Sequence, residues 1–136
     1  MARFGVTLLR VVLGLVYTMH AYLALAIFGP SGMVAYQVKN GIPFPEIATW
    51  YLILAHGLGG LCLVLGIFPR WAALANLPVM LGALVFVHLK QGYFLKGVLV
   101  SNAPQEAGYE YVLLIVGATL AQVLLGGGAL AITRRS

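Results

Sequence analysis

Apolar residues fill four long segments of the chain, and few charged residues lie inside them. A transmembrane helix needs about 20 mostly apolar residues, because the hydrocarbon core of a bilayer is about 30 Å thick. The segments that reach this length are residues 5–28, 46–68, 71–89 and 109–132. The pattern therefore predicts an all-α fold, namely a polytopic membrane protein built as a four-transmembrane-helix bundle.

The stretches between these segments are short or rich in helix-breaking residues. A link with several glycines and prolines spans residues 29–45, a tight turn lies at 69–70, and a longer loop covers 90–108. No stretch remains for a soluble domain, so residues 1–136 are expected to form a single membrane domain. The composition agrees, because only 8% of the residues are charged, against about 25% in ordinary globular domains.

Cationic residues predict the orientation of the bundle, because lysine and arginine near helix ends favour the cytoplasmic side. The residues at one end are Arg3, Arg10, Arg70, Arg134 and Arg135. Those at the other end are Lys39, Lys90 and Lys96. The arginine-rich end is the better cytoplasmic candidate, so we expect a location in the cell inner (cytoplasmic) membrane with both termini in the cytoplasm. This rule and anionic lipid account for the net charge of +5 without a nucleic-acid partner.

A few titratable side chains lie inside the predicted helices, where such groups are costly and usually face the bundle interior. With a rise of about 1.5 Å per residue, His20, His88 and Glu110 all fall towards the outer leaflet. Tyr17 lies one helical turn below His20, and His56 lies close to the bilayer midplane. These five residues are the candidate site.

Two interpretations of this group remain open. Histidine and tyrosine near a membrane interface are common belt residues, and Glu110 in the first turn of its helix would complement the helix dipole. Alternatively, the group forms a polar site in which a carboxylate facing an imidazole could bind a quinone head group and exchange protons with it. Two histidines on separate helices could also ligate a b-type haem, but no supporting haem pattern accompanies the pair, so haem is not expected.

Three further residues lead to separate expectations. A neutral His56 ring at the midplane needs a hydrogen-bond partner, and Asn76 and Gln122 are the candidates. Arg10 lies near the inner end of the first helix, where its side chain is expected to extend to the lipid head groups. Cys62 is the only cysteine and is expected to act as a small hydrophobic residue, so no disulfide or metal site is predicted.

Several segments, taken in order along the chain, resemble a known family. They are LRVVLGLVYTMHAY, GIPFP, GLGGLCLVLGIFPRWAAL, VHLKQGYF and GYEYVLLIVGATLAQVLLGGG. Together they resemble the DoxX family of small four-helix bacterial and archaeal membrane proteins, across nearly the whole chain. The residues that match the family pattern are His20, Gly57, Gly60, Arg70, His88, Gly92, Gly108 and Glu110. His56 departs from that pattern, because the family usually has glutamate there, and the usual Gly-Pro-Gly-containing C-terminal ending is also missing.

The resemblance implies a role in a redox complex, since the family includes the membrane subunit of thiosulfate:quinone oxidoreductase. The leading hypothesis is an integral subunit that anchors a partner and contributes to a quinone or electron-transfer site, with other membrane subunits and lipid as its partners. The alternatives are a non-catalytic assembly or stabilising subunit and, third, a small-solute carrier. Catalysis by this chain alone is not expected and no catalytic residue is assigned, because the sequence has no nucleophile with its base and no phosphate loop.

Overall fold

The computed structural model describes residues 1–94 and 108–133, and every regular element in this part of the chain is helical. Three helical stretches, Ala2–Ile27, Pro45–Leu65 and Pro69–Gln91, are long and apolar enough to cross a membrane. A shorter apolar helix, α6, spans Tyr109–Leu125. Its 17 residues extend about 25 Å, slightly less than the hydrocarbon core. The predicted helical membrane bundle is thus confirmed.

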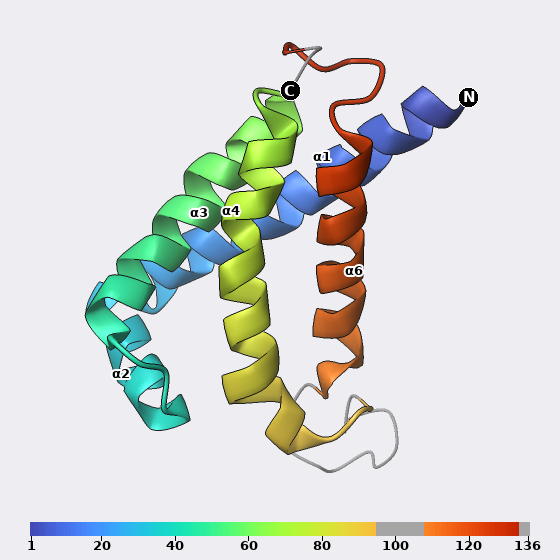
Figure 1. The fold of residues 1–136 in the computed structure, drawn as a ribbon. Helices are drawn as coiled ribbons and strands as arrows, with labels where there is room; N and C mark the ends of the chain where they lie inside the picture. Colours follow the sequence, from blue (N-terminus) through green and yellow to red (C-terminus); the bar gives the residue numbers. More distant parts are fainter. Residues whose placement is uncertain (95–107, 134–136) are drawn as a thin grey trace.

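The long helices pack around a shared apolar core. Helix α1 (Ala2–Tyr22) runs obliquely along α3 (Pro45–Leu65), and α4 (Pro69–Gly82) packs against both α3 and α6 (Figure 1). The backbones of α1 and α3 approach closely at two glycines, since a Cβ added at Gly14 would lie 2.7 Å from the carbonyl oxygen of Gly60. Small residues allow this approach inside lipid, where no hydrophobic effect drives helices together.

Two of the long helices end in wider turns. Helix α1 continues into a π-helical turn, η1 (Leu23–Ile27). Helix α4 continues into a second π-helical turn, η2 (Ala83–His88), followed by a 3₁₀ turn, η3 (Leu89–Gln91). Such π-helical turns often occur at functional sites, and both of these contribute residues to the cavity described below.

No helix was expected in the link at residues 29–45, but most of this link is helical. Helix α2 spans Gly29–Asn40, with proline near its start and Gly41 in the left-handed conformation (φ 75°) at its end. Proline in the first turn and glycine just after the last are start and stop signals for a helix, although both also suggest a loop. At 12 residues, α2 is too short to span the bilayer. It packs against η1 and α3, and Met33 joins the buried cluster there.

The last predicted helix ends earlier than expected, at Leu125 and not at residue 132. The chain turns at Gly126, which has a φ of 80°, and residues 126–133 cross the end of the bundle as a segment without helix. Hydrogen bonds hold this segment in place, from the Ala129 amide to the Arg3 carbonyl (3.0 Å) and from the Thr133 amide to the Gly66 carbonyl (3.1 Å). We call residues 126–133 the C-terminal strap.

Arg10 does not extend to the lipid head groups, contrary to expectation. Its side chain is only 1% exposed and donates hydrogen bonds to the carbonyls of Leu63 (2.6 Å), Val64 (3.2 Å) and Leu130 (3.2 Å). Leu63 and Val64 lie in the last turn of α3, whose carbonyls carry the negative end of the helix dipole. Arg10 therefore caps α3 and attaches the C-terminal strap to it.

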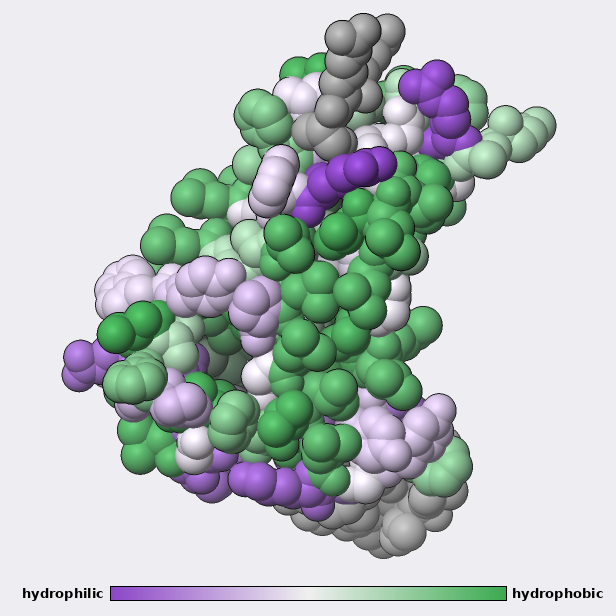
Figure 2. Space-filling view, in the orientation of Figure 1, coloured by the Kyte–Doolittle hydropathy of each residue, from purple (hydrophilic) through white to green (hydrophobic). Residues whose placement is uncertain are grey.

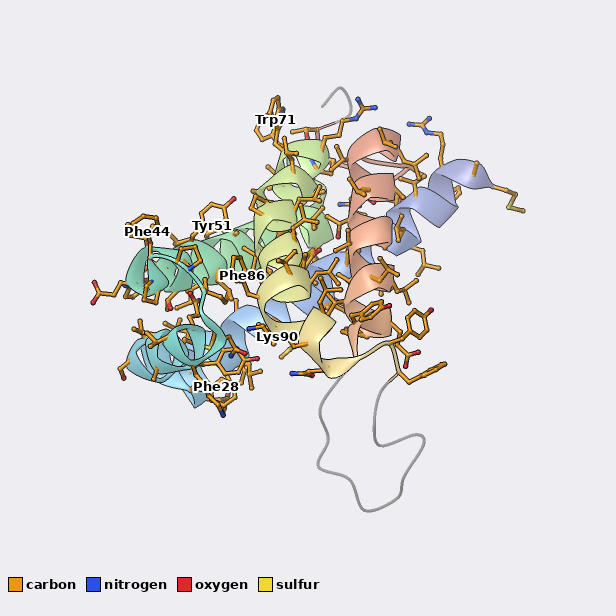
Figure 3. The ribbon with its side chains drawn as sticks, turned by 60° about the horizontal axis from the view of Figure 1, so that its bottom comes forward. Phe28, Phe44, Tyr51, Trp71, Phe86 and Lys90 are labelled. Carbon is orange, nitrogen blue, oxygen red and sulfur yellow. The ribbon has the colours of Figure 1, made fainter. Side chains whose placement is uncertain are left out.

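On the face shown in Figure 2, the strongly hydrophilic residues lie towards the two ends of the bundle, and the surface between them is mostly apolar. Arg3 lies at the end that carries the C-terminal strap, where its carbonyl accepts from the Ala129 amide. Arg70 precedes Trp71, which Figure 3 shows at this end of the bundle. Lys90 lies at the opposite end, where its Nζ donates to the Asn40 carbonyl at 3.4 Å. Of the remaining residues used for the orientation, Lys96, Arg134 and Arg135 fall outside the described residues.

Candidate functional site

A cavity of about 330 Å³ lies among the helices near the lysine-bearing end of the bundle. Residues from α1, η1, α2, α3, α4, η2 and α6 line it, and most of them are apolar. The polar side chains in its wall are His20, His56, His88, Tyr17, Tyr36 and Tyr111. The chain contains 3 histidines, and all of them line this one cavity.

Helices α1 and α3 bring three rings of the cavity wall together, those of Tyr17, His20 and His56. Tyr17 and His20 are three residues apart on α1 and so share one face, and His56 meets them from α3. The rings of Tyr17 and His56 are 4.7 Å apart between centroids, and those of His20 and His56 are 6.3 Å apart and nearly perpendicular. The close approach of α1 to α3 at the glycines places these rings in contact.

Tyr17 is anchored to the far side of the bundle. It is 1% exposed, and its hydroxyl is hydrogen-bonded to Oγ1 of Thr119 on α6. The Thr119 hydroxyl also reaches the Ile115 carbonyl at 2.7 Å. Because that carbonyl can only accept, Thr119 donates to it and accepts from Tyr17. The phenol ring therefore lies against His56 while its proton is directed away from the cavity.

His56 has the interior position and one of the two partners that the sequence predicts. Its ring is 4% exposed, and its Nδ1 lies 2.7 Å from Oδ1 of Asn76 on α4. Asn76 is completely buried, and its Nδ2 donates to the Ala72 carbonyl at 2.8 Å. The other candidate partner, Gln122, is used elsewhere, because its amide donates to the Gly126 carbonyl at the end of α6.

The other predicted site residues lie around the wall of the cavity or next to it. His20 is more exposed than His56, and its Nδ1 is 2.9 Å from the Val16 carbonyl. His88, the last residue of η2, approaches from a separate element. Glu110 lies in the first turn of α6 and does not line the cavity, whereas its neighbour Tyr111 does.

Helix α2 supplies site residues that the sequence did not reveal. Tyr36 and Met33 lie on this helix and complete the wall. Partial burial raises the pKa of the Tyr36 phenol, so this group stays protonated and neutral at physiological pH. These residues were missed because the segment was taken for a loop. The proline and glycine at the two ends of the helix were the available signal.

A second, smaller cavity of about 180 Å³ lies beside the first, among α2, α3, α4 and η2. The two cavities share Tyr36, Ala83 and His88 in their walls. Tyr51, which lies on α3 (Figure 3), lines this second cavity and donates to the Ala75 carbonyl at 2.7 Å. The walls of both cavities are mostly apolar, and the polar side chains of the second are Tyr36, Gln37, Tyr51 and His88.

These features define a multi-pass membrane protein with a ligand-sized cavity inside its helical bundle. A family model matches residues 5–89, well over half of the chain, and is that of DoxX. The chain therefore belongs to the DoxX family. No curated protein and no solved structure matches it. The matched region contains His20, His56, Asn76 and His88, and it ends before α6. Within the described residues, no group of three or more histidine, cysteine, aspartate or glutamate side chains is arranged to hold a metal ion.

Proposed function

We propose that this chain is an integral subunit of a membrane redox complex and that its cavity binds the head group of a quinone. DoxX proteins are associated with membrane redox-related proteins. The observation that carries the proposal is the convergence of all three histidines on one apolar cavity. Imidazoles can hydrogen-bond both redox forms of a quinone head group and can exchange protons with it.

The dimensions and chemistry of the cavity support this ligand class. Small-molecule sites have volumes of about 300–1,000 Å³ and are mostly apolar with a few placed polar groups, and the cavity of about 330 Å³ fits this description. The adjoining cavity of about 180 Å³ would accommodate the start of an isoprenoid tail beside Ala83. A quinone likewise consists of a polar head-group ring and an apolar isoprenoid tail.

The partners and the orientation are part of the same proposal. A subunit of a complex buries part of its perimeter against other subunits, and exposed apolar side chains cover most of the surface between the two ends (Figure 2). The arginine-rich end would face the cytoplasm, in accord with the positive-inside rule. The cavity would then lie in the outer half of the inner membrane.

Quinone binding to the full chain in lipid nanodiscs tests the proposal. We expect decylubiquinone or a short-chain menaquinone to bind the wild type, and Ala83→Phe to weaken binding about tenfold or more because the added ring occupies the cavity. The control is Ala26→Phe, which adds the same ring to an exposed position on η1 and should bind normally. The proposal fails if the wild type binds neither compound in its oxidised or its reduced form, or if both variants bind like the wild type.

A structural role is the second candidate, and the hydrogen bonds of the same residues favour it. His56 connects α3 to α4 through Asn76, and Tyr17 connects α1 to α6 through Thr119. If these contacts serve only assembly, His56→Leu should reduce the amount of complex recovered from membranes. If they serve a quinone site, the complex should assemble and lose quinone-linked turnover. A fully assembled and fully active His56→Leu complex would contradict both candidates.

A further inference from the structure

The hydrogen bonds inside the cavity wall determine which ring nitrogens carry protons. A neutral imidazole has one N–H donor and one acceptor nitrogen. In both His20 and His56, Nδ1 is the nitrogen engaged by the protein. The identity of each partner therefore decides whether Nε2, the other nitrogen, is a donor or an acceptor.

For His56 the partner is an oxygen that can only accept. Asn76 donates through Nδ2 to the Ala72 carbonyl (2.8 Å), which orients its amide so that Oδ1 faces the imidazole at 2.7 Å. An amide oxygen accepts and does not donate, so Nδ1 of His56 carries the proton. A protonated, charged ring is disfavoured here because the side chain is buried in an apolar wall without a carboxylate partner in the described part of the chain. Nε2 of His56 is thus an acceptor.

The tautomer of His20 follows in the same way, from a hydrogen bond to a backbone carbonyl. Its Nδ1 lies 2.9 Å from the Val16 carbonyl, which also can only accept. His20 therefore carries its proton on Nδ1 and presents Nε2 as an acceptor, close to His56, because the two ring centroids are 6.3 Å apart.

Tyr17 does not donate a hydrogen bond into the cavity. Its hydroxyl proton is used in the hydrogen bond to Thr119, whose own proton goes to the Ile115 carbonyl. Tyr36 and Tyr111 also line the cavity, and their hydroxyl groups can rotate to donate or to accept, so they do not favour either kind of ligand. His88 contributes a third imidazole from η2. Among Tyr17, His20 and His56, two ring nitrogens are therefore left to accept hydrogen bonds from a ligand, and no hydrogen is left to donate to one.

The hydrogen-bond directions point to a ligand that donates. Resting on the proposed function, we infer that the cavity binds the dihydroxy (quinol) form of the head group in preference to the dione (quinone) form. A quinol hydroxyl donates to Nε2 of His56 or His20, whereas a quinone carbonyl meets two acceptors and finds no donor among Tyr17, His20 and His56. His56 is buried, and a buried acceptor left without a donor is costly, so the difference should appear directly in affinity.

Nitrogen-15 NMR of the wild-type chain in lipid bilayers tests the tautomers without any ligand. The chain contains 3 histidines, so selective labelling gives three pairs of ring-nitrogen signals, which single substitutions assign. We expect the pattern of Nδ1 protonated and Nε2 bare for both His20 and His56. Protonation of Nε2 in both rings would overturn the inference, whatever the ligand experiments show.

Binding of matched small ligands tests the preference itself. Duroquinol, its dimethyl ether and duroquinone have the same substituted ring, but only duroquinol can donate a hydrogen bond. In nanodiscs under argon, we expect duroquinol to bind roughly tenfold more tightly than either of the others. His56→Phe retains an aromatic ring beside Tyr17 but lacks the acceptor, and should remove most of this preference for duroquinol.

The outcomes separate this inference from the proposed function. Equal binding of duroquinol and duroquinone by the wild type would overturn the inference and leave a quinone site in place. Binding of none of the three ligands would reject the proposed function and the inference together. A stronger affinity for duroquinone would show that the wall donates hydrogen bonds, contrary to the geometry.

Discussion

The hydrogen bond between His56 and Asn76 can be measured by a double-mutant cycle. His56→Leu leaves the buried Oδ1 of Asn76 without a donor, and Asn76→Leu leaves Nδ1 of His56 without an acceptor. Each single change should lower the free energy of unfolding by about 1–3 kcal/mol, the usual cost of an unpaired buried polar group. The double variant replaces both partners with apolar side chains and should cost less than the sum of the two.

The expected coupling has a definite size. Hydrogen bonds between transmembrane helices contribute about 0.6 kcal/mol on average and about 1.7 kcal/mol at most, because polar groups in the unfolded state also find partners in the membrane. His56 is 4% exposed, Asn76 is 0% exposed, and their bond measures 2.7 Å. The coupling energy of such a short, buried hydrogen bond should lie in the upper half of that range. We therefore expect a coupling of about 1–1.7 kcal/mol.

Reversible unfolding of the full chain in mixed micelles, followed by circular dichroism over a denaturing-detergent titration, gives the four free energies. The control cycle combines Ile47→Ala with Trp71→Ala, exposed residues in the first turns of α3 and α4 at opposite ends of the bundle. These two changes should be additive because they are distant and share no partner. Additivity in the His56–Asn76 cycle as well would refute the reasoning, since it would mean that the bond contributes no stability.

Three further predictions follow from other parts of the bundle. Arg10→Met should increase hydrogen exchange at the amides of the C-terminal strap, because the contact with the Leu130 carbonyl is lost; Arg3→Met, whose strap contact is through the backbone, should not. Gly14→Val should cost at least about 1–3 kcal/mol and reduce the yield of folded protein, because a Cβ there would overlap α3; Gly117→Ala, which meets nothing within 4 Å, should be tolerated. A reporter fused to the C-terminus should be active in the cytoplasm, and an external location would reverse the proposed orientation.

The sequence by itself determined the class of protein and the position of most helices. Hydropathy and length are local properties, and an apolar run of about 20 residues has few alternatives to a membrane-spanning helix. The interior position of His56 also followed from the sequence. A polar ring near the midplane must be satisfied by one of the few polar side chains at similar depth, which left Asn76 and Gln122 as candidates, and the structure shows that Asn76 is the partner.

The tertiary structure alone decided which side chains meet. Helix α2 was hidden because proline and glycine mark both helix ends and loops, and its contribution of Tyr36 to the cavity depends on its packing against α3. The role of Arg10 depends on the C-terminal strap folding back over the end of α3, a contact between residues 120 positions apart. The assembly of three histidines around one cavity likewise depends on how each helix is rotated about its axis. Hydropathy is more uniform around α3, α4 and α6 than around α1, so the rotation of these three helices is set by the packing of small residues and by hydrogen bonds between helices.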